Sequence, residues 1–447
     1  MEALWALLLF VTVAAVLMLG YPVAVTLGGV SLWFAGIGIL TGWFDADLLS
    51  ALPSRLYGII NNDILMAVPA FVLMGVILEK SKLAETLLHN MSNLLGNRRG
   101  GHLFALLIVG ALLAASTGIV GATVVTLGLL ALPVMKKNGY DPALASGVVC
   151  ASGTLGQIIP PSIVLILLGD VLSNAYQQAQ LQMQVFSGDT VSIGDLFKGA
   201  LIPGMMLVGL YALYLLYMRW RKPETMPVIE TTEKTSLWVV LKALLPPLLL
   251  IVLVLGSILT GKASPTEAAS VGSLGALILA LVYKQLTLGR FLEALTETVK
   301  VTAMVFMILI GAAIFALVFK GFQGDVAVQN LLTDLPGGKM TALFIVMVIL
   351  FLLGFILDFI EITFVVIPIV GPVLLMMGFD PVWLGVMIAI NLQTSFLTPP
   401  FGFALFYLRG VSDIKTTTLY KGVIPFIILQ LFMLILLAFF PELVRII

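Results

Sequence analysis

Two polar clusters interrupt apolar stretches of the chain, at residues 152–157 and 391–398, and each is followed by a Pro-Pro pair. Hydroxyl, amide and carbonyl oxygens are the ligands that hard cations prefer. A helix that breaks inside lipid also frees carbonyl groups that attract a cation and N–H groups that attract an anion. The clusters together predict a site for sodium and an anionic substrate. For any single hydroxyl, a bond back to its own helix is the plain structural alternative.

Two carboxylates, Asp358 and Glu361, stand alone as charged residues in the apolar run 341–379. An ionisable group inside a membrane segment is costly and usually functional. We therefore expect Asp358 to be a site or gating residue. For Glu361, solvation at the tip of a hairpin is an equally open interpretation.

Residues for other chemistries are scarce. The chain has a single cysteine, Cys150, and two histidines, His89 and His102, which argues against a disulfide framework, a multi-cysteine metal site or a histidine relay. We find no zinc-protease motif, no serine-nucleophile constellation and no glycine-rich phosphate loop. The net charge of zero gives no indication of nucleic acid. We predict a protein that is not an enzyme and needs no organic cofactor.

The composition is that of a membrane protein. Of 447 residues, 60% are hydrophobic and 10% are charged, whereas soluble domains carry about 25% charged residues. Several uncharged runs exceed the roughly 18 residues that mark a membrane-spanning helix. The chain is predicted to be an all-α polytopic membrane protein with about ten full crossings. The apolar N-terminal run reads as an uncleaved first helix.

One uncharged run, residues 103–135, is too long for a single crossing. As one helix it would span about 50 Å, against about 30 Å for the hydrocarbon core. Basic residues flank it at 98–99 and 136–137, and basic flanks stay in the cytoplasm. The run is therefore predicted to be a re-entrant hairpin over about 101–137, with its tip at residues 116–123.

The run 341–379 is similar in length but lacks the basic flanks. We interpret it as a second hairpin that enters from the outer face, with a polar tip at residues 358–363. The stretch 170–195 has three aspartates and no lysine or arginine, so it is expected outside.

An internal repeat relates the two halves of the chain at a fixed offset of 239 residues. Residues 139–142 (Gly-Tyr-Asp-Pro) recur as residues 378–381 (Gly-Phe-Asp-Pro), and the two Pro-Pro pairs fall in the same register. An odd number of crossings in each half would invert the second half relative to the first. The alternative, chance matching of glycines and prolines, would not explain the shared register. The predicted segments are a first repeat at 1–221 with a broken helix at about 142–169, a cytoplasmic linker at 222–237, and a second repeat at 238–447 with a broken helix at about 381–408.

Several motifs spread over the whole chain resemble the large membrane subunit of tripartite ATP-independent periplasmic (TRAP) transporters. The motifs are residues 153–156 (Gly-Thr-Leu-Gly), 159–162 (Ile-Pro-Pro-Ser), 265–269 (Pro-Thr-Glu-Ala-Ala), Gly354 with Asp358, and Asn391 with 398–400 (Thr-Pro-Pro) and Gly402. The resemblance implies a multi-pass permease of the bacterial inner membrane that works as a sodium-coupled symporter by an elevator mechanism. It also implies three kinds of partner besides membrane lipid: a small four-helix membrane subunit, a periplasmic substrate-binding protein, and a small organic acid, usually a carboxylate.

Carried over by position, the resemblance places the site at the two breaks and the hairpin tips. We expect substrate contacts from Ser116, Thr117, Gly156, Gln157, Gln393, Ser395 and Thr398. We expect sodium ligands from Ser152, Gly153, Thr154, Asn391, Thr394 and Asp358. The sequence departs from the family at three places. Other members often have a tip rich in glycine and serine at the first hairpin, an apolar residue in place of Gln157, and a glycine in place of Ser395.

Two competing functions stay open at this point. One is a stand-alone ion-coupled anion transporter or antiporter of related fold that needs no binding protein. The other is an intramembrane enzyme, which would require a catalytic constellation that we do not find. The sequence names neither the organic acid nor the sodium stoichiometry.

Overall fold

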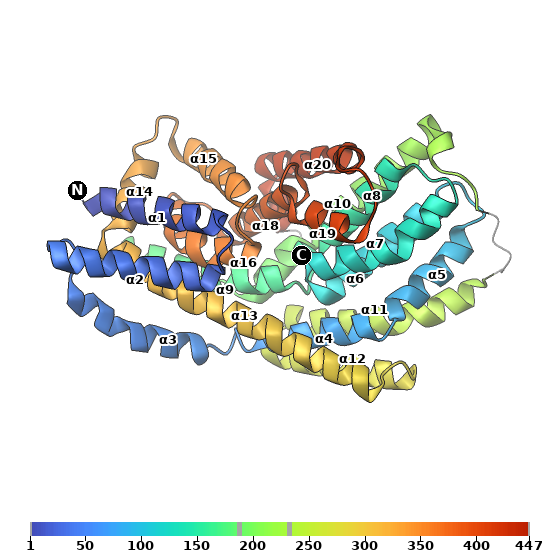
Figure 1. The fold of residues 1–447 in the computed structure, drawn as a ribbon, viewed down its shortest axis with the longest axis horizontal. Coiled ribbons are helices and arrows are strands. Elements are labelled where there is room, and N and C mark those ends of the chain that lie inside the picture. Colours follow the sequence, from blue (N-terminus) through green and yellow to red (C-terminus); the bar gives the residue numbers. More distant parts are fainter. Residues whose placement is uncertain (1, 186–189, 230–234, 446–447) are drawn as a thin grey trace. The chain divides into compact units, whose positions relative to one another are not determined.

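The chain is helical throughout the part that the computed structural model describes, which is residues 2–185, 190–229 and 235–445 (Figure 1). No strand occurs among these residues. Eight of their helices are long and apolar enough to cross a membrane by length and composition, and shorter apolar helices accompany them. The all-α polytopic fold expected from the composition is confirmed.

By its internal contacts the chain divides into two compact units. The first comprises Met1–Met66, Leu167–Ser192 and Val299–Gly385. The second comprises Ala67–Ile166, Ile193–Thr298 and Val386–Ile447. Each unit takes segments from both predicted repeats, so this division is a different one from the repeat in the sequence. The two units are described separately below.

The first unit holds the N-terminal helices and the second predicted hairpin. Its elements are α1 (Glu2–Met18), α2 (Val23–Thr41), η1 (Ala46–Ala51), α3 (Leu52–Ile60), most of α9 (Ile163–Gln182) and of α13 (Leu288–Gly321), α14 (Gly324–Thr333), α15 (Gly338–Leu353), α16 (Phe359–Glu361), η4 (Ile362–Val366) and α17 (Ile367–Met376).

The second unit holds the first predicted hairpin and most of the residues expected at the site. Its elements are α4 (Ala67–Lys80), α5 (Leu83–Leu95), α6 (Gly101–Thr117), α7 (Val120–Lys137), α8 (Pro142–Thr154), η2 (Leu155–Gln157), α10 (Ile193–Arg221), η3 (Pro223–Thr225), α11 (Leu237–Leu259), α12 (Pro265–Val282), most of α18 (Pro381–Leu397), α19 (Phe403–Val411), α20 (Thr416–Phe439) and η5 (Pro441–Val444).

Close helix contacts in the second unit depend on glycine. Helix α8 packs against α6, α7 and α20, and α4 packs against α12. At the contact of α8 with α20, a Cβ atom added to Gly147 would overlap the carbonyl of Gly422, and one added to Gly422 would overlap the carbonyl of Ala143. Small residues let membrane helices approach backbone to backbone in this way.

The first hairpin has the bounds that the sequence predicts. Helix α6 ends at Thr117, Gly118 turns the chain with a left-handed φ of 62°, and α7 runs from Val120 to Lys137. In Figure 1 the two helices lie side by side, and they are in contact along their lengths. Glycine takes this backbone conformation without a Cβ penalty, which explains a turn at this position.

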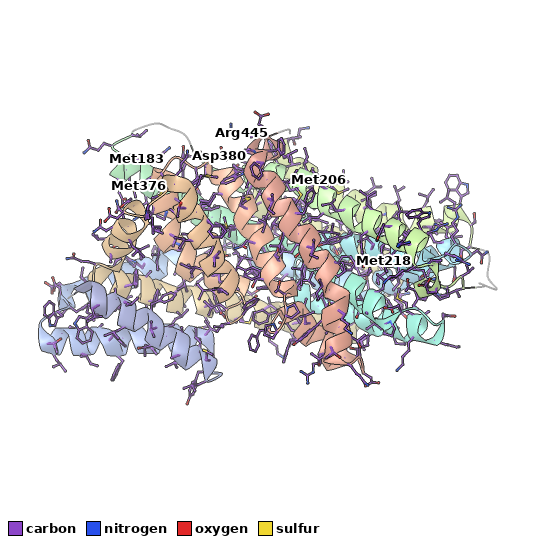
Figure 2. The ribbon with its side chains drawn as sticks, turned by 90° about the horizontal axis from the view of Figure 1, so that it is seen from above. Met183, Met206, Met218, Met376, Asp380 and Arg445 are labelled. Atoms are coloured by element: carbon purple, nitrogen blue, oxygen red, sulfur yellow. The ribbon has the colours of Figure 1, made fainter. Side chains whose placement is uncertain are left out.

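The second hairpin turns slightly earlier than predicted. Helix α15 ends at Leu353, and an irregular segment of mostly apolar residues precedes Asp358, which caps α16. The predicted tip at residues 358–363 is therefore the start of the second helix of the hairpin. Its two carboxylates cap the N-terminus of this helix and do not belong to a loop. Figure 2 labels Met376 near the end of α17 and Asp380 just beyond it, where the hairpin ends.

One further helix boundary differs from the sequence predictions, and two short helices were not predicted. The second part of the first broken helix runs on to Gln182 rather than stopping near residue 169, since the alanine, leucine and glutamine of this stretch are good helix formers. Helices α3 and α14 were not predicted. They have 9 and 10 residues, too few for a crossing, which takes about 20.

Corresponding elements of the two predicted repeats begin in register. Helices α7 and α16 begin at Val120 and Phe359, and α8 and α18 begin at Pro142 and Pro381, each pair 239 residues apart. The Pro-Pro peptide bonds at the two breaks, Pro160-Pro161 and Pro399-Pro400, are cis. The shared register fits the predicted internal repeat, in which residues 238–447 repeat the pattern of residues 1–221.

Candidate functional site

The first break separates α8 from α9. The helix tightens into η2 at Leu155–Gln157 and then leaves regular structure until Ile163. The first hairpin packs closely on this break. A Cβ atom on Gly110 would lie 2.6 Å from Cβ of Ser152, and one on Gly156 would lie 2.8 Å from the carbonyl oxygen of Ala114. Glycines at 110 and 156 thus bring α6 against the broken segment.

Several polar atoms at the breaks are buried without a hydrogen-bond partner among the residues that the structure describes. They are Oγ of Ser152, both side-chain amide atoms of Gln157, and Oε1 of Gln393. All three side chains are fully buried. An unsatisfied buried polar group costs about 1–3 kcal/mol, and such groups in folded proteins call for an explanation such as an ion or a water molecule. These atoms are suited to a cation or a polar ligand.

The second break separates α18 from α19, between Leu397 and Phe403. The hydroxyl of Thr394 donates to the carbonyl of Ile390 at 2.7 Å, and that of Thr398 donates to the carbonyl of Thr394 at 2.7 Å. Asn391 and Ser395 are buried on the same helix. The threonine hydroxyls thus donate their hydrogen bonds to carbonyls of their own helix. Their oxygen atoms can still accept a hydrogen bond or bind a cation.

A polar network joins the two breaks. Gln393 donates through Nε2 to Oγ1 of Thr154 at 3.5 Å, and the hydroxyl of Tyr211 lies close to the Gln393 side chain. Tyr211 in turn accepts from Nε2 of Gln430 at 2.7 Å. The positions Thr154 and Gln393 are related by the repeat offset of 239 residues, so equivalent positions of the two predicted copies are in contact.

Two members of this network, Tyr211 and Gln430, were not predicted from the sequence. Gln430 is fully buried in the otherwise apolar α20. A lone amide inside a membrane helix normally needs a partner on another helix, and this signal was available in the sequence. Its partner, 219 residues away, was not.

The tip of the first hairpin is polar and buried. Ser116 and Thr117 donate to the carbonyl of Leu113 at 2.9 Å and 3.0 Å. The hydroxyls of Thr117 and Thr123 lie 2.8 Å apart across the turn. A Cβ atom on Gly75 would lie 2.8 Å from Cα of Thr117, so α4 packs directly on the tip. These bonds fix the shape of the tip and leave oxygen acceptors for a ligand.

Of the predicted site residues, Asp358 alone belongs to the first unit. Its side chain accepts from the backbone N–H of Phe359 at 2.7 Å, and Glu361 accepts from the backbone N–H of Asp358 at 3.1 Å. Together they form a capping box, which satisfies N–H groups at a helix start. Glu361 is the more deeply buried of the two, beside apolar residues of α1 and α2.

The donor set at the breaks suits sodium better than a transition metal. Across the described residues, no group of three or more His, Cys, Asp or Glu side chains could hold a metal ion. The oxygens gathered at the breaks are neutral hydroxyls, amides and carbonyls. Weakly bound hard cations accept such ligands. Gly153 adds no side chain, and a Cβ atom there would overlap Val124 of α7.

Comparison with known proteins assigns the chain to a transporter family. Residues 10–443 match the family described as tripartite ATP-independent periplasmic transporter, DctM component. The chain is 31% identical over 426 residues to the sialic acid TRAP transporter large permease protein SiaM of Vibrio cholerae, covering 95% of this chain and 93% of that protein. It is 29% identical over 441 residues to the C4-dicarboxylate TRAP transporter large permease protein DctM of Rhodobacter capsulatus, covering 98% and 97%.

Two further similarities concern a longer relative and a solved structure. The chain is 30% identical to the isethionate TRAP transporter permease protein DctMQ of Oleidesulfovibrio alaskensis, covering 97% of this chain and 65% of that protein. Among solved structures, the YdaH transporter of Alcanivorax borkumensis aligns with a TM-score of 0.63 and 18% identity, over 89% of this chain and 90% of that chain. The structural likeness concerns the fold.

Proposed function

Since the chain belongs to the large permease subunits of TRAP transporters, we propose that it imports a small organic acid in symport with sodium. Members of this family are multi-pass membrane proteins and not enzymes, and their transporters include a small membrane subunit and a periplasmic binding protein. Relatives named for C4-dicarboxylates, sialic acid and isethionate all handle small organic anions. A carboxylate is the proposed substrate group here.

The observation that carries the proposal is the set of unpartnered buried polar atoms on Ser152, Gln157 and Gln393. The C-terminal ends of α8 and α18 add carbonyl oxygens with partial negative charge, which favour a cation. The N-terminal ends of α9 and α19 add N–H groups, which favour an anion. If the cation and anion sites lie side by side, a bound cation strengthens the binding of the anion, and a bound anion strengthens the binding of the cation. This mutual effect is the physical basis of the proposed symport.

Transport itself is proposed to follow from the repeat. Two inverted copies whose broken helices meet near the middle of the membrane can expose one site alternately to either side. The tip of the first hairpin, which includes Ser116 and Thr117, then covers the site. In this elevator mechanism the broken helices and tips move with the substrate, and Asp358 and Glu361 hold the second hairpin in shape.

The test is uptake into proteoliposomes that contain the chain with its small membrane subunit, with purified binding protein and a labelled organic acid outside. We expect uptake to require both an inward sodium gradient and the binding protein. Asn391→Ala should weaken the sodium dependence at least tenfold. Equal uptake when potassium replaces sodium would refute the coupling. Equal uptake without the binding protein would instead support a stand-alone transporter.

A further inference from the structure

A cavity lies in the second unit, away from the two breaks, where four helix ends converge. The C-terminal end of α7 and the N-terminal end of α8 form one wall, and the connection from α19 to α20 forms the other. Its volume is about 380 Å³. The residues that matter are two lysines, a serine, an aspartate and an apolar pair: Lys136, Lys415, Ser412, Asp413, Leu132 and Ala145.

The rim of this cavity is positively charged. Lys136 and Lys415 are both exposed, and neither forms an ion pair within the described residues. Asp413 is the carboxylate among the lining residues, and it is exposed as well. The neighbouring carboxylate of Asp141 is engaged as the cap of α8, accepting from the N–H of Leu144 at 2.8 Å. Counted over its lining residues, the cavity holds two lysines and one aspartate and so has a net positive charge.

Hydrogen-bond donors lie beside the lysines. Helix α20 starts at Thr416 without a side-chain cap, and the N–H of Thr418 donates to the carbonyl of Lys415 at 2.9 Å, so the N–H groups of Thr416 and Thr417 remain for an anion. Oγ of Ser412 is shielded from solvent and has no hydrogen-bond partner in the described part of the chain. These groups, with the two ammonium groups, are the recognition elements of a phosphate or carboxylate.

The inner wall is apolar. Leu132 and Ala145 are buried behind the rim, so they offer a surface for methylene groups rather than for a hydrated ion. A small dianion would fill the rim and leave this wall bare. A ligand with an anionic head and an apolar body would use both.

The cavity lies at the ends of two helices that are long and apolar enough to span a membrane, Val120–Lys137 and Thr416–Phe439. Helix α7 ends at Lys137 and α20 begins at Thr416, so the lysines are at helix ends, and the charge pattern places both on the cytoplasmic side. The cytoplasmic leaflet carries anionic lipid, and basic pockets between membrane helices on this side bind such headgroups. We propose that the cavity binds the headgroup of an anionic phospholipid, with phosphate on Lys136 and Lys415 and the glycerol backbone against Leu132 and Ala145.

The test compares two variants that lose the same charge. Lys136→Ala with Lys415→Ala removes the rim lysines, and Lys137→Ala with Lys421→Ala removes two exposed lysines nearby that do not line the cavity. Each protein, purified with its small membrane subunit in detergent, is titrated with phosphatidylglycerol or phosphatidylcholine while its unfolding temperature is recorded. At about 1 kcal/mol per lysine, the rim variant should need about thirtyfold more phosphatidylglycerol for the same shift.

The control variant and the wild-type protein should respond alike to phosphatidylglycerol, and phosphatidylcholine should give no specific shift. An equal response of the rim variant would overturn the proposal. The same titration is repeated with two soluble anions, inorganic phosphate and succinate. If either stabilises the wild-type protein as much as phosphatidylglycerol does, the cavity is a site for a soluble anion and the lipid assignment fails. Because this readout is stability rather than uptake, it stands apart from the sodium test above.

Discussion

Replacing Ser152 by alanine should separate a functional polar group from a structural one. Ser152 and Ser146 lie on the same helix, α8, and both side chains are fully buried. The Ser146 hydroxyl donates to the carbonyls of Pro142 at 2.7 Å and Ala143 at 3.0 Å. The Ser152 hydroxyl has no hydrogen-bond partner within residues 2–185, 190–229 and 235–445. Ser146→Ala is therefore a matched control for Ser152→Ala.

Without sodium, the two variants should move stability in opposite directions. Ser152→Ala removes an unsatisfied buried group, whose burial costs about 1–3 kcal/mol, and leaves only a one-atom gap. It should equal or exceed the wild-type stability by up to about 2 kcal/mol. Ser146→Ala removes a satisfied hydrogen bond and should lose about 0.5–1.5 kcal/mol.

With sodium, the stability difference between the two variants should shrink. A ligand that binds only the folded state at 100 times its Kd stabilises it by about 2.7 kcal/mol. If the loss of one oxygen ligand weakens sodium binding tenfold, the Ser152→Ala variant loses about 1.4 kcal/mol of that gain. The Ser146→Ala variant should keep the whole gain.

The assay is thermal unfolding of the purified complex in choline chloride and in sodium chloride at equal ionic strength. From the size trend, 1 kcal/mol corresponds to roughly 1–2 °C for a chain of this length. The reasoning is refuted if Ser152→Ala destabilises the sodium-free protein as much as Ser146→Ala does and still shows the full sodium-dependent rise in unfolding temperature.

Three further predictions test the topology, the packing and a helix end. Cysteines introduced at Lys136 and Asp380 should be labelled from opposite sides of the membrane, and labelling from one side would contradict the inverted repeat. Gly422→Ala should destabilise the protein by about 1–3 kcal/mol in denaturant unfolding, because its Cβ would overlap the backbone of α8, whereas Gly209→Ala, with open space around it, should be neutral or stabilising. Ser264→Ala should lose about 1 kcal/mol, since it removes the capping box of α12; unchanged stability would show that this cap is dispensable.

The sequence was most informative where charge and chain length constrain a membrane helix. Residues 103–135 had to fold back because their basic flanks and their length exclude a single crossing, and the structure turns at Gly118, inside the predicted tip. The breaks before Pro160-Pro161 and Pro399-Pro400 could be located because each proline pair follows a polar cluster, whereas the pair Pro246-Pro247, which no such cluster precedes, lies within the continuous helix α11. In the first hairpin a local rule leaves a single outcome.

The turn of the second hairpin shows where such rules are insufficient. The carboxylates of Asp358 and Glu361 suggested a solvated tip, but their i, i+3 spacing also fits a capping box, and the structure uses them so. The actual turn is formed by mostly apolar residues after Leu353, which carry no polar signal. A polar residue in a membrane segment thus marks a helix start as readily as a loop.

The contact between Thr154 and Gln393 could not be predicted from local patterns, yet it bears on the architecture most directly. Two residues at the same position in two copies of a unit can touch only where the axis that relates the copies passes between them. If the repeat is inverted, the breaks therefore meet on that axis, and a change at either one acts on both copies of the site. Gln393→Met should then weaken sodium-dependent stabilisation as Ser152→Ala does, although the two residues lie in different repeats.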